Sequence, residues 1–467
     1  MNKTIVLPKV ILGCIFSIGF LNNTIYCQNQ KNITFLDQWK NDSLITNSSL
    51  SRYSGCWGFN QNGSEYAVIG STEGTHVFRI TENNTLVSSG FIKGKFSDAS
   101  VIHREYKTYQ NYLYAVCDEG YSSLQIIDLS YLPDSLHLIK DMGAPLFGKT
   151  HNIFIDTSEA TLYLCKVTPV LDSTILNPVP MRVFSLSDPT NPTLLWEGPS
   201  DIAEVHDVYV NENEAILNCG FDGIRCYDFS NPSNPYFSQS IDFYQDQGYN
   251  HQGWLSPNKT DYFFADENSG MKIKHYKRLP DKTLVYKSMF GYNFENGSTP
   301  HNIQCDDKFV YVAYYNEGLR IFDYRTTPPQ QIAYYDTYLQ ESNFTMNGAW
   351  GVHSNYESNK LIISDRQNGL FLFQFDPDIY PHPNETPQAF PNPTIEGESV
   401  FFSFPYFING NKKISIYNLS GKLIYEKSDA NNTIFKVLIK KGYYLSVFEY
   451  EDYLGEIKRH TLSIAVL

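Results

Sequence analysis

Positive charge is scarce in this sequence and is nowhere clustered. The 467 residues include 36 Lys and Arg against 50 Asp and Glu, so the formal net charge is −14, and only 18% of residues are charged. A protein that binds nucleic acid needs grouped Lys and Arg side chains to displace counterions from phosphates. The lack of basic stretches therefore excludes nucleic acid as an expected partner.

Sequence signatures of common enzymes are also missing. The chain contains no G-x-S-x-G nucleophile elbow, no P-loop, no G-x-G-x-x-G after a strand and no H-E-x-x-H helix. No two of its 8 Cys are spaced as C-x-x-C, which argues against a structural zinc site of thiolates. We therefore name no catalytic residues and favour a protein that is not an enzyme.

Long apolar runs are confined to the N-terminus. Lys3 and Lys9 precede or border an apolar run, residues 10–20, which is too short to span a bilayer and is typical of a secretory signal peptide. We predict that residues 1–27 are this signal and that no transmembrane segment follows. The mature chain is then expected to be secreted or to lie on the outer cell surface.

Six cysteines remain after such a cleavage, an even number that an oxidising compartment would allow to pair. Cys117, Cys165 and Cys219 each lie near the end of an apolar run, where a small buried side chain fits. We predict buried free thiols, with disulfides as the alternative.

Aromatic residues are abundant, and they accompany a repeat. The 35 Tyr and 31 Phe, with 29 Gly and 23 Pro as turn formers, predict an all-β chain of many short strands. Seven segments align at steps of 45 to 55 residues, a period typical of β-propeller blades. The residues that mark them are Trp57, His103, His151, His206, His251, His301 and Trp350. We predict a seven-bladed β-propeller over residues 28–375.

The last repeat ends after residues 370–373 without a fourth strand. Residues 34–39 resemble the fourth strand of the other repeats. We therefore expect this first strand of the mature chain to complete the last sheet, which would leave no open edge in the propeller.

A constant spacing links the marked residues to a second polar position. Carboxylates follow five of them at a distance of 16 residues, and Arg366 holds this place after Trp350. The five are Glu73, Glu119, Asp222, Glu267 and Glu317. The start of one hairpin strand and the end of the other lie at the same edge, so we expect these groups at one mouth of the central channel.

Two interpretations of this pattern stay open. In the first, each His donates a hydrogen bond to its own carboxylate, a structural device whose repetition in nearly every blade is expected. In the second, the channel mouth is a binding site for a ligand or a divalent metal. The metal would be held by His151, His206, His251 and His301, and the ligand by Glu73, Glu119, Asp222, Glu267, Glu317, Trp57, Trp350 and Arg366. No other cofactor is expected.

A change in composition marks a second module. Residues 376–389 form a Pro-rich linker, and residues 390–467 have the strand alternation of a small β-sandwich. The segments 390–394, 414–422 and 442–447 resemble the C-terminal sorting domain of the type IX secretion system. This resemblance implies that the type IX machinery is a partner and carries the chain across an outer membrane.

Parts of the repeats resemble the choice-of-anchor B family of LVIVD-repeat propellers. The matching segments are 66–74, 111–128, 300–302, 314–320, 348–352 and 364–370. The resemblance implies a secreted or surface propeller and no established activity. We therefore expect a non-catalytic propeller that binds an extracellular protein or glycan. The alternative is a metal-assisted lyase or hydrolase that acts on polysaccharide through the channel histidines.

Overall fold

The chain is all-β in the part that the computed structural model describes, residues 30–172, 174–339, 345–377, 386–404, 411–430, 434–451 and 457–467. Small antiparallel sheets make up these residues, and no α-helix occurs among them. The all-β prediction is confirmed. The predicted signal peptide, residues 1–27, lies outside the described residues, as do residues 378–385 of the predicted linker.

Successive stretches of the chain form four-stranded sheets, most of them from strands that follow one another in sequence. The first is β3 (Tyr53–Gln61), β4 (Ser64–Ser71), β5 (Gly74–Ile80) and β6 (Leu86–Lys93). The next is β7 (Arg104–Tyr109), β8 (Tyr112–Cys117), β9 (Leu124–Asp128) and β10 (His137–Met142). Then come β11 (Lys149–Asp156), β12 (Thr161–Thr168), β15 (Val179–Ser185) and β16 (Thr193–Gly198), with the small hairpin β13 (Val170–Leu171) and β14 (Thr174–Ile175) inserted after β12.

The same pattern continues through the second half of this region. The sheets are β17 (Asp207–Asn211), β18 (Glu214–Asn218), β19 (Ile224–Asp228) and β20 (Tyr236–Ile241), followed by β21 (Asn250–Leu255), β22 (Asp261–Asp266), β23 (Ile273–Arg278) and β24 (Leu284–Phe290). The short 3-10 helix η1 (Phe294–Asn296) leads to β25 (Ile303–Cys305), β26 (Phe309–Ala313), β27 (Leu319–Asp323) and β28 (Gln330–Tyr335). The last sheet contains β29 (Ala349–His353), β30 (Lys360–Asp365) and β31 (Gly369–Gln374).

The beginning of the chain completes this last sheet. Strand β2 (Thr34–Trp39) pairs antiparallel with β31, with Trp39 opposite Leu370. The prediction that residues 34–39 supply the missing strand is confirmed. A two-residue strand that was not predicted, β1 (Gln30–Lys31), pairs with the edge of β28.

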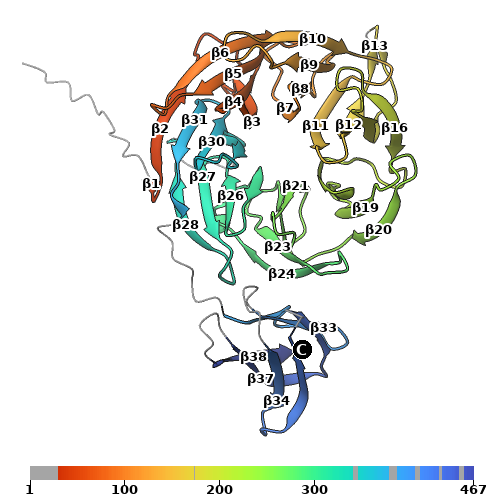
Figure 1. Cartoon of the computed structure of the whole chain (residues 1–467), viewed down its shortest axis with the longest axis vertical. Helices are drawn as coiled ribbons and strands as arrows, with labels where there is room; N and C mark the ends of the chain where they lie inside the picture. Colours follow the sequence, from red (N-terminus) through yellow and green to blue (C-terminus); the bar gives the residue numbers. More distant parts are fainter. Residues whose placement is uncertain are drawn as a thin grey trace, which may run out of the picture.

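The sheets surround a common centre, with the first strand of each sheet innermost (Figure 1). These inner strands are β3, β7, β11, β17, β21, β25 and β29, and each contacts the next, while β29 contacts β3. Buried apolar clusters fill the space between neighbouring sheets. Tyr66 and Val68, for example, pack with Tyr106 and Leu113 of the following sheet.

Packing on both faces explains the sequence of the middle strands. Successive side chains of a strand point to opposite faces, so a sheet that is covered on both sides needs apolar residues throughout. Strand β26 reads Phe-Val-Tyr-Val-Ala, and all five residues are buried. The last sheet and the first share such a cluster as well, in which Ile362 and Leu372 pack with Tyr53 and Ala67.

Six free cysteines lie in these buried clusters or beside them: Cys56, Cys117, Cys165, Cys219, Cys226 and Cys305. The prediction of buried free thiols is confirmed for the described residues. Burial raises the pKa of both Cys56 and Cys226 to about 12. The thiols are therefore protonated at neutral pH.

The C-terminal part forms two further sheets over a core of its own. One sheet contains β32 (Gln388–Phe390), β33 (Ser399–Ser403) and β36 (Ile434–Leu438), and the other contains β35 (Leu423–Asp429), β34 (Lys412–Asn418), β37 (Gly442–Glu451) and β38 (Ile457–Val466). Strand β32 contacts β24 of the preceding region. Within the described residues, no helix has the length and apolar character that crossing a membrane requires.

Candidate functional site

Five His and one Trp side chain form an unbroken ring where the inner strands begin. Neighbouring ring centroids lie 4.1 to 5.2 Å apart all the way around. The order is His103, His151, His206, His251, His301, Trp350 and back to His103. We call these six residues the histidine ring.

The repeat in the sequence produces this ring through the inner strands. His151, His251 and Trp350 lie within the first three residues of β11, β21 and β29, and the other members just precede their strands. Backbone hydrogen bonds to the second strand hold them there, as at His206, whose N–H donates to the carbonyl oxygen of Asn218 at 2.8 Å. Side chains one repeat apart therefore become neighbours around the centre.

Two of the predicted pairs at the 16-residue spacing are close together. The Nδ1 atom of His103 lies 2.6 Å from Oε1 of Glu119, which is a direct hydrogen bond. The Nε2 atom of His251 lies 3.7 Å from Oε2 of Glu267, which is beyond hydrogen-bond distance. The predicted spacing therefore places both carboxylates beside the histidine ring.

The other three carboxylates at the 16-residue spacing contact residues other than their marked residues. Glu317 forms an ion pair with Arg320 at 3.0 Å and accepts a hydrogen bond from Ser298 instead of contacting His301. Asp222 accepts from the backbone N–H of Ala203 at 3.3 Å, and Glu73 from that of Ile45, also at 3.3 Å. The expected pairing of these three carboxylates with their own marked residues is not found, because each carboxylate binds other groups.

Two contacts between sheets take the place of those pairs. His151 bonds through Nδ1 to Asp118 of the preceding sheet at 2.8 Å. The Nε2 atom of His301 lies 3.7 Å from Glu267, again one sheet back. Spacing within one repeat cannot reveal such contacts, because they depend on how neighbouring sheets pack.

Trp57 is absent from the histidine ring, contrary to expectation. Strand β3 begins at Tyr53, and its register shifts between Tyr53 and Cys56, so Trp57 is the fifth residue of the strand. Its indole lies inside the ring of strands, away from the histidine ring. The centre of the indole is 4.8 Å from the centre of the His353 ring and 4.2 Å from the Nζ atom of Lys107. Trp350 is the second residue of β29, whereas Trp57 is the fifth of β3, so Trp57 lies too far along its strand to join the ring.

Trp350 and Arg366 are brought together as predicted. The guanidinium of Arg366 lies 5.0 Å from the centre of the Trp350 indole, a cation–π contact. Arg366 also donates through Nη1 to the carbonyl oxygen of Met346 at 2.5 Å. Its guanidinium is therefore held over the sixth member of the ring.

Three of the ring histidines are buried, and burial sets their charge. His206, His251 and His301 expose 4%, 3% and 2% of their surface. Burial lowers the pKa of His251 to about 4, and burial together with neighbouring histidines holds the pKa of His206 and His301 well below the usual range. These three imidazoles are neutral at neutral pH, so each has one ring nitrogen with a lone pair that can accept a hydrogen bond or bind a metal ion.

A buried charged cluster inside the ring of strands was missed at the sequence level. Glu105, Lys107 and Asp207 lie there together, and Asn152 donates to Asp207 at 2.7 Å. Burial raises the pKa of Asp207 to about 8 and lowers that of Lys107. A signal was present, because the residues that follow His151, His206, His251 and His301 are Asn, Asp, Gln and Asn, all of them polar.

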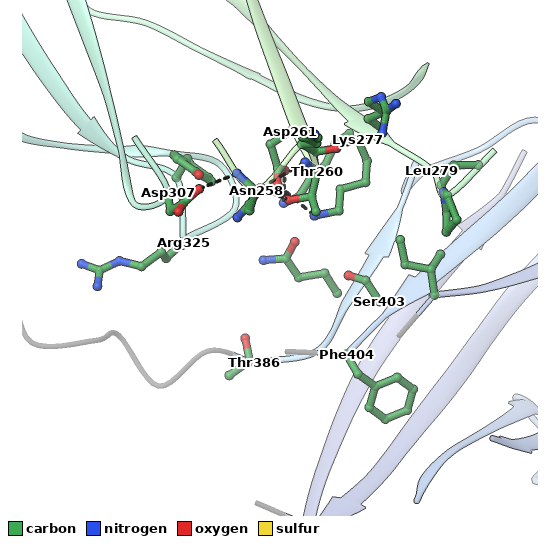
Figure 2. A pocket seen from close by; sticks show the side chains of 17 residues that line it. Asn258, Thr260, Asp261, Lys277, Leu279, Asp307, Arg325, Thr386, Ser403 and Phe404 are labelled. Carbon is green, nitrogen blue, oxygen red and sulfur yellow. Dashed lines mark hydrogen bonds and ion pairs between the residues drawn. The ribbon is translucent and has the colours of Figure 1, made fainter. Parts of the chain in front are cut away.

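A separate pocket lies at the opposite end of the sheets, beside the C-terminal part. Figure 2 shows the 258–261 loop and Asp307 on one side and Ser403 and Phe404 on the other. Its charged groups bind one another: Lys277 lies 2.9 Å from Asp261, and the backbone N–H of Asn258 donates to Asp307 at 2.8 Å. These contacts stabilise the loops around the pocket. We therefore take the histidine ring, and not this pocket, as the candidate site.

Comparison with known proteins gives only distant structural similarity. No family model and no curated protein matches the chain. A solved protein from Lactobacillus plantarum is 13% identical, with a TM-score of 0.49, and the match covers 83% of this chain and 99% of that one. Two structures of an extracellular domain of a putative one-component or hybrid two-component system from B. thetaiotaomicron are each 11% identical, with TM-scores of 0.45 and 0.47 over 92% of this chain. The present chain spans 58% and 59% of their length.

Proposed function

We propose that this chain is an exported, non-catalytic binding protein built on a closed seven-bladed β-propeller. The inner strands contact one another in sequence order, and the last contacts the first. Apolar clusters between neighbouring sheets, including the last and the first, support the same arrangement. Strand β2 would complete the last sheet and close the propeller, so that the outer edge of β31 is no longer exposed.

Export is proposed to run through the type IX secretion system, with residues 390–467 as the sorting domain. The support is the motif resemblance of residues 390–394, 414–422 and 442–447, together with the separate core of this part. The signal peptide at residues 1–27 and the membership of the choice-of-anchor B family are part of the same proposal. The protein would then act outside the cell or on its surface.

The observation that carries the binding function is the unequal distribution of exposed apolar side chains. On the loops that surround the histidine ring, which we call the ring face, large hydrophobic residues are exposed at Ile45, Leu50, Tyr121, Leu171, Ile175, Phe221, Phe243 and Met346. At the opposite end of these sheets, Tyr131 is exposed on a described loop, and Tyr236 and Phe237 are exposed where β20 begins. Exposed apolar residues that gather on one face are typical of an interaction surface.

The chemistry of the ring face favours a protein as the partner. Five of its eight exposed hydrophobic residues are aliphatic or Met, and such side chains bury against protein surfaces, whereas sugar rings stack on aromatic ones. Phe243 is 90% exposed and Phe221 is 74% exposed, so both are available to a partner. The carboxylates beside the histidine ring add negative charge, which would speed association with a basic partner.

A structural role for part of the histidine ring is supported by two similar polar contacts. His103 with Glu119 and His151 with Asp118 make the same kind of bond in successive positions around the centre. A structural device is expected to recur in this way, whereas a catalytic site normally combines a few different residues.

Site-specific photo-crosslinking tests this proposal. A photoreactive amino acid is placed at position 221 or 243 on the ring face, or at position 131 as the matched control on the opposite loops. The labelled protein is then incubated with the extracellular proteins of the producing cells. We expect discrete crosslinked species from positions 221 and 243 and none of these from 131. Equal patterns from all three positions would overturn the proposed binding face.

A further inference from the structure

Two sectors of the histidine ring have the arrangement of a metal site: one contains His103, Asp118 and His151, and the other contains His206, His251 and Glu267. His206, His251 and Glu267 each offer a ligand atom, and these three atoms lie within 4.8 Å of one another. The groups come from two neighbouring sheets: His206 precedes β17, whereas His251 lies on β21 and Glu267 follows β22. Nitrogen and carboxylate ligands together suit a borderline divalent ion such as Zn²⁺.

Hydrogen bonds to backbone carbonyls orient two of the imidazoles. Nδ1 of His206 lies 2.9 Å from the carbonyl oxygen of His251, and Nδ1 of His301 lies 2.6 Å from that of Trp350. A carbonyl oxygen can only accept, so Nδ1 carries the proton in both rings and Nε2 of each neutral ring bears a lone pair. Histidines that bind metals are usually oriented by this kind of second hydrogen bond.

Glu267 lies at a distance from two imidazoles that suits an ion between them. Its Oε2 atom is 3.7 Å from Nε2 of His251, and its Oε1 atom is 3.7 Å from Nε2 of His301. Zinc bonds to nitrogen and oxygen are about 2.0–2.2 Å long, so two ligands at a tetrahedral angle on one ion lie about 3.4 Å apart. Tyr315 donates its hydroxyl hydrogen to Oε1 and fixes the carboxylate.

His251 supplies an independent sign that a partner is needed. Its side chain is 3% exposed, and its Nδ1 atom is buried with no hydrogen-bond partner among the described residues. Its Nε2 atom is 3.7 Å from Glu267, which is too far for a hydrogen bond. A buried ring nitrogen with no hydrogen bond is unfavourable, so protein groups satisfy His251 less fully than they satisfy His206 and His301, whose Nδ1 atoms both have a carbonyl partner.

The other His and carboxylate groups of the ring do not need an ion. His103 and His151 already form direct hydrogen bonds with Glu119 and Asp118, at 2.6 and 2.8 Å. This sector therefore serves as an internal control with the same residue types.

We propose that the protein binds one divalent ion of the zinc class through His206, His251 and Glu267, with His301 as the additional nitrogen ligand. The ion would join the sheets that begin with β17, β21 and β25, at the centre of the ring face. Metal binding is measured without any partner, so this proposal and the proposed partner-binding function can fail separately.

The test uses the full chain, purified without chelator, stripped with a chelator and titrated with Zn²⁺. We expect one equivalent of zinc by elemental analysis and a higher melting temperature with zinc. Glu267→Gln should weaken zinc binding by more than about tenfold, whereas the matched variant Glu119→Gln should leave it unchanged.

Cobalt binding is a second measurement of the site. It uses the wild-type protein alone, so it does not require any variant to fold. Co²⁺ added to the stripped wild-type protein should produce the visible absorption of a tetrahedral site with nitrogen ligands. Wild-type protein that takes up neither zinc nor cobalt would overturn the proposal. So would equal losses of zinc affinity in the Glu267→Gln and Glu119→Gln variants.

Discussion

The indole Nε1–H of Trp350 donates a hydrogen bond to Oε1 of Glu105 over 3.2 Å, although the two residues are 245 positions apart in the sequence. Trp350 belongs to the histidine ring, and Glu105 to the buried charged cluster inside it. This bond therefore links the two polar layers at the centre of the molecule. Burial raises the pKa of Glu105 above its ordinary range.

Replacement of Glu105 should distinguish the loss of a side chain from the loss of its charge. We expect Glu105→Ala to lower the free energy of unfolding by about 1–3 kcal/mol, because the buried indole N–H loses its acceptor. Glu105→Gln keeps an oxygen in place and should cost less. Denaturant unfolding of both variants at pH 7 checks this order, and a Gln variant that is as unstable as the Ala variant would contradict it.

Trp39 fastens β2 to the first sheet. Its ring lies 5.6 Å from that of Tyr53 and 4.8 Å from that of Phe78. We expect Trp39→Ala to destabilise the protein by about 3 kcal/mol, as large-to-small changes at packed aromatic residues do. Thr34→Ala, at an exposed position of the same strand, is the control and should have little effect. Thermal unfolding that shifts equally in both variants would show that β2 is not fastened through Trp39.

Buried neutral histidines should make the protein sensitive to acid. Burial lowers the pKa of His353 to about 3 in the folded protein, whereas the pKa in the unfolded chain is about 6.5. The unfolded state therefore binds more protons below pH 6.5, and stability falls as the pH is lowered from about 6.5 to about 3. At pH 5 this single residue should cost about 2 kcal/mol relative to pH 7.5.

The variant His353→Phe keeps an aromatic ring beside Trp57 and removes the titrating group. We expect its unfolding free energy to fall less than that of the wild type between pH 7.5 and pH 5. His137→Phe, at an exposed position on β10, should leave the pH dependence unchanged. Identical pH profiles for wild type and His353→Phe would rule out this residue as a source of acid sensitivity.

The buried thiols should be inert until the protein unfolds. A thiolate is the reactive form, and burial holds the pKa of Cys219 as well as that of Cys56 far above neutral pH. We expect no rapid reaction with a thiol reagent in the native state and six reactive thiols from these positions in denaturant without reductant. Fewer reactive thiols in the unfolded chain would reveal disulfides, contrary to the structure.

The sequence predicted features that depend on local periodicity. The repeat of about fifty residues, the alternating strands and the extra strand at residues 34–39 all reflect patterns within the chain, and the sheets follow them. The spacing of 16 residues placed Glu119 and Glu267 correctly, because the start of the first strand and the end of the second lie at the same edge of each hairpin.

Features that depend on the position of a residue along its strand and on neighbouring sheets could not be predicted in this way. Trp57 lies opposite Val68, further along its strand than the marked residues of the ring, and the repeat in the sequence does not reveal this offset. The contact of His151 with Asp118 joins side chains of different sheets. Its distance is set by how the sheets pack around the centre, which spacing along the chain does not report.

The pairing of β2 with β31 ties the order of synthesis to the order of folding. Gln38 donates to the carbonyl oxygen of Asn368 at 2.7 Å, across 330 positions. A nascent chain cannot make this contact until almost every other strand has been produced, and until then the edge of β31 has no partner. Strand β2 can therefore pair only after a segment about 330 residues further along the chain has been made, so the earliest strand of this region is among the last to find its place.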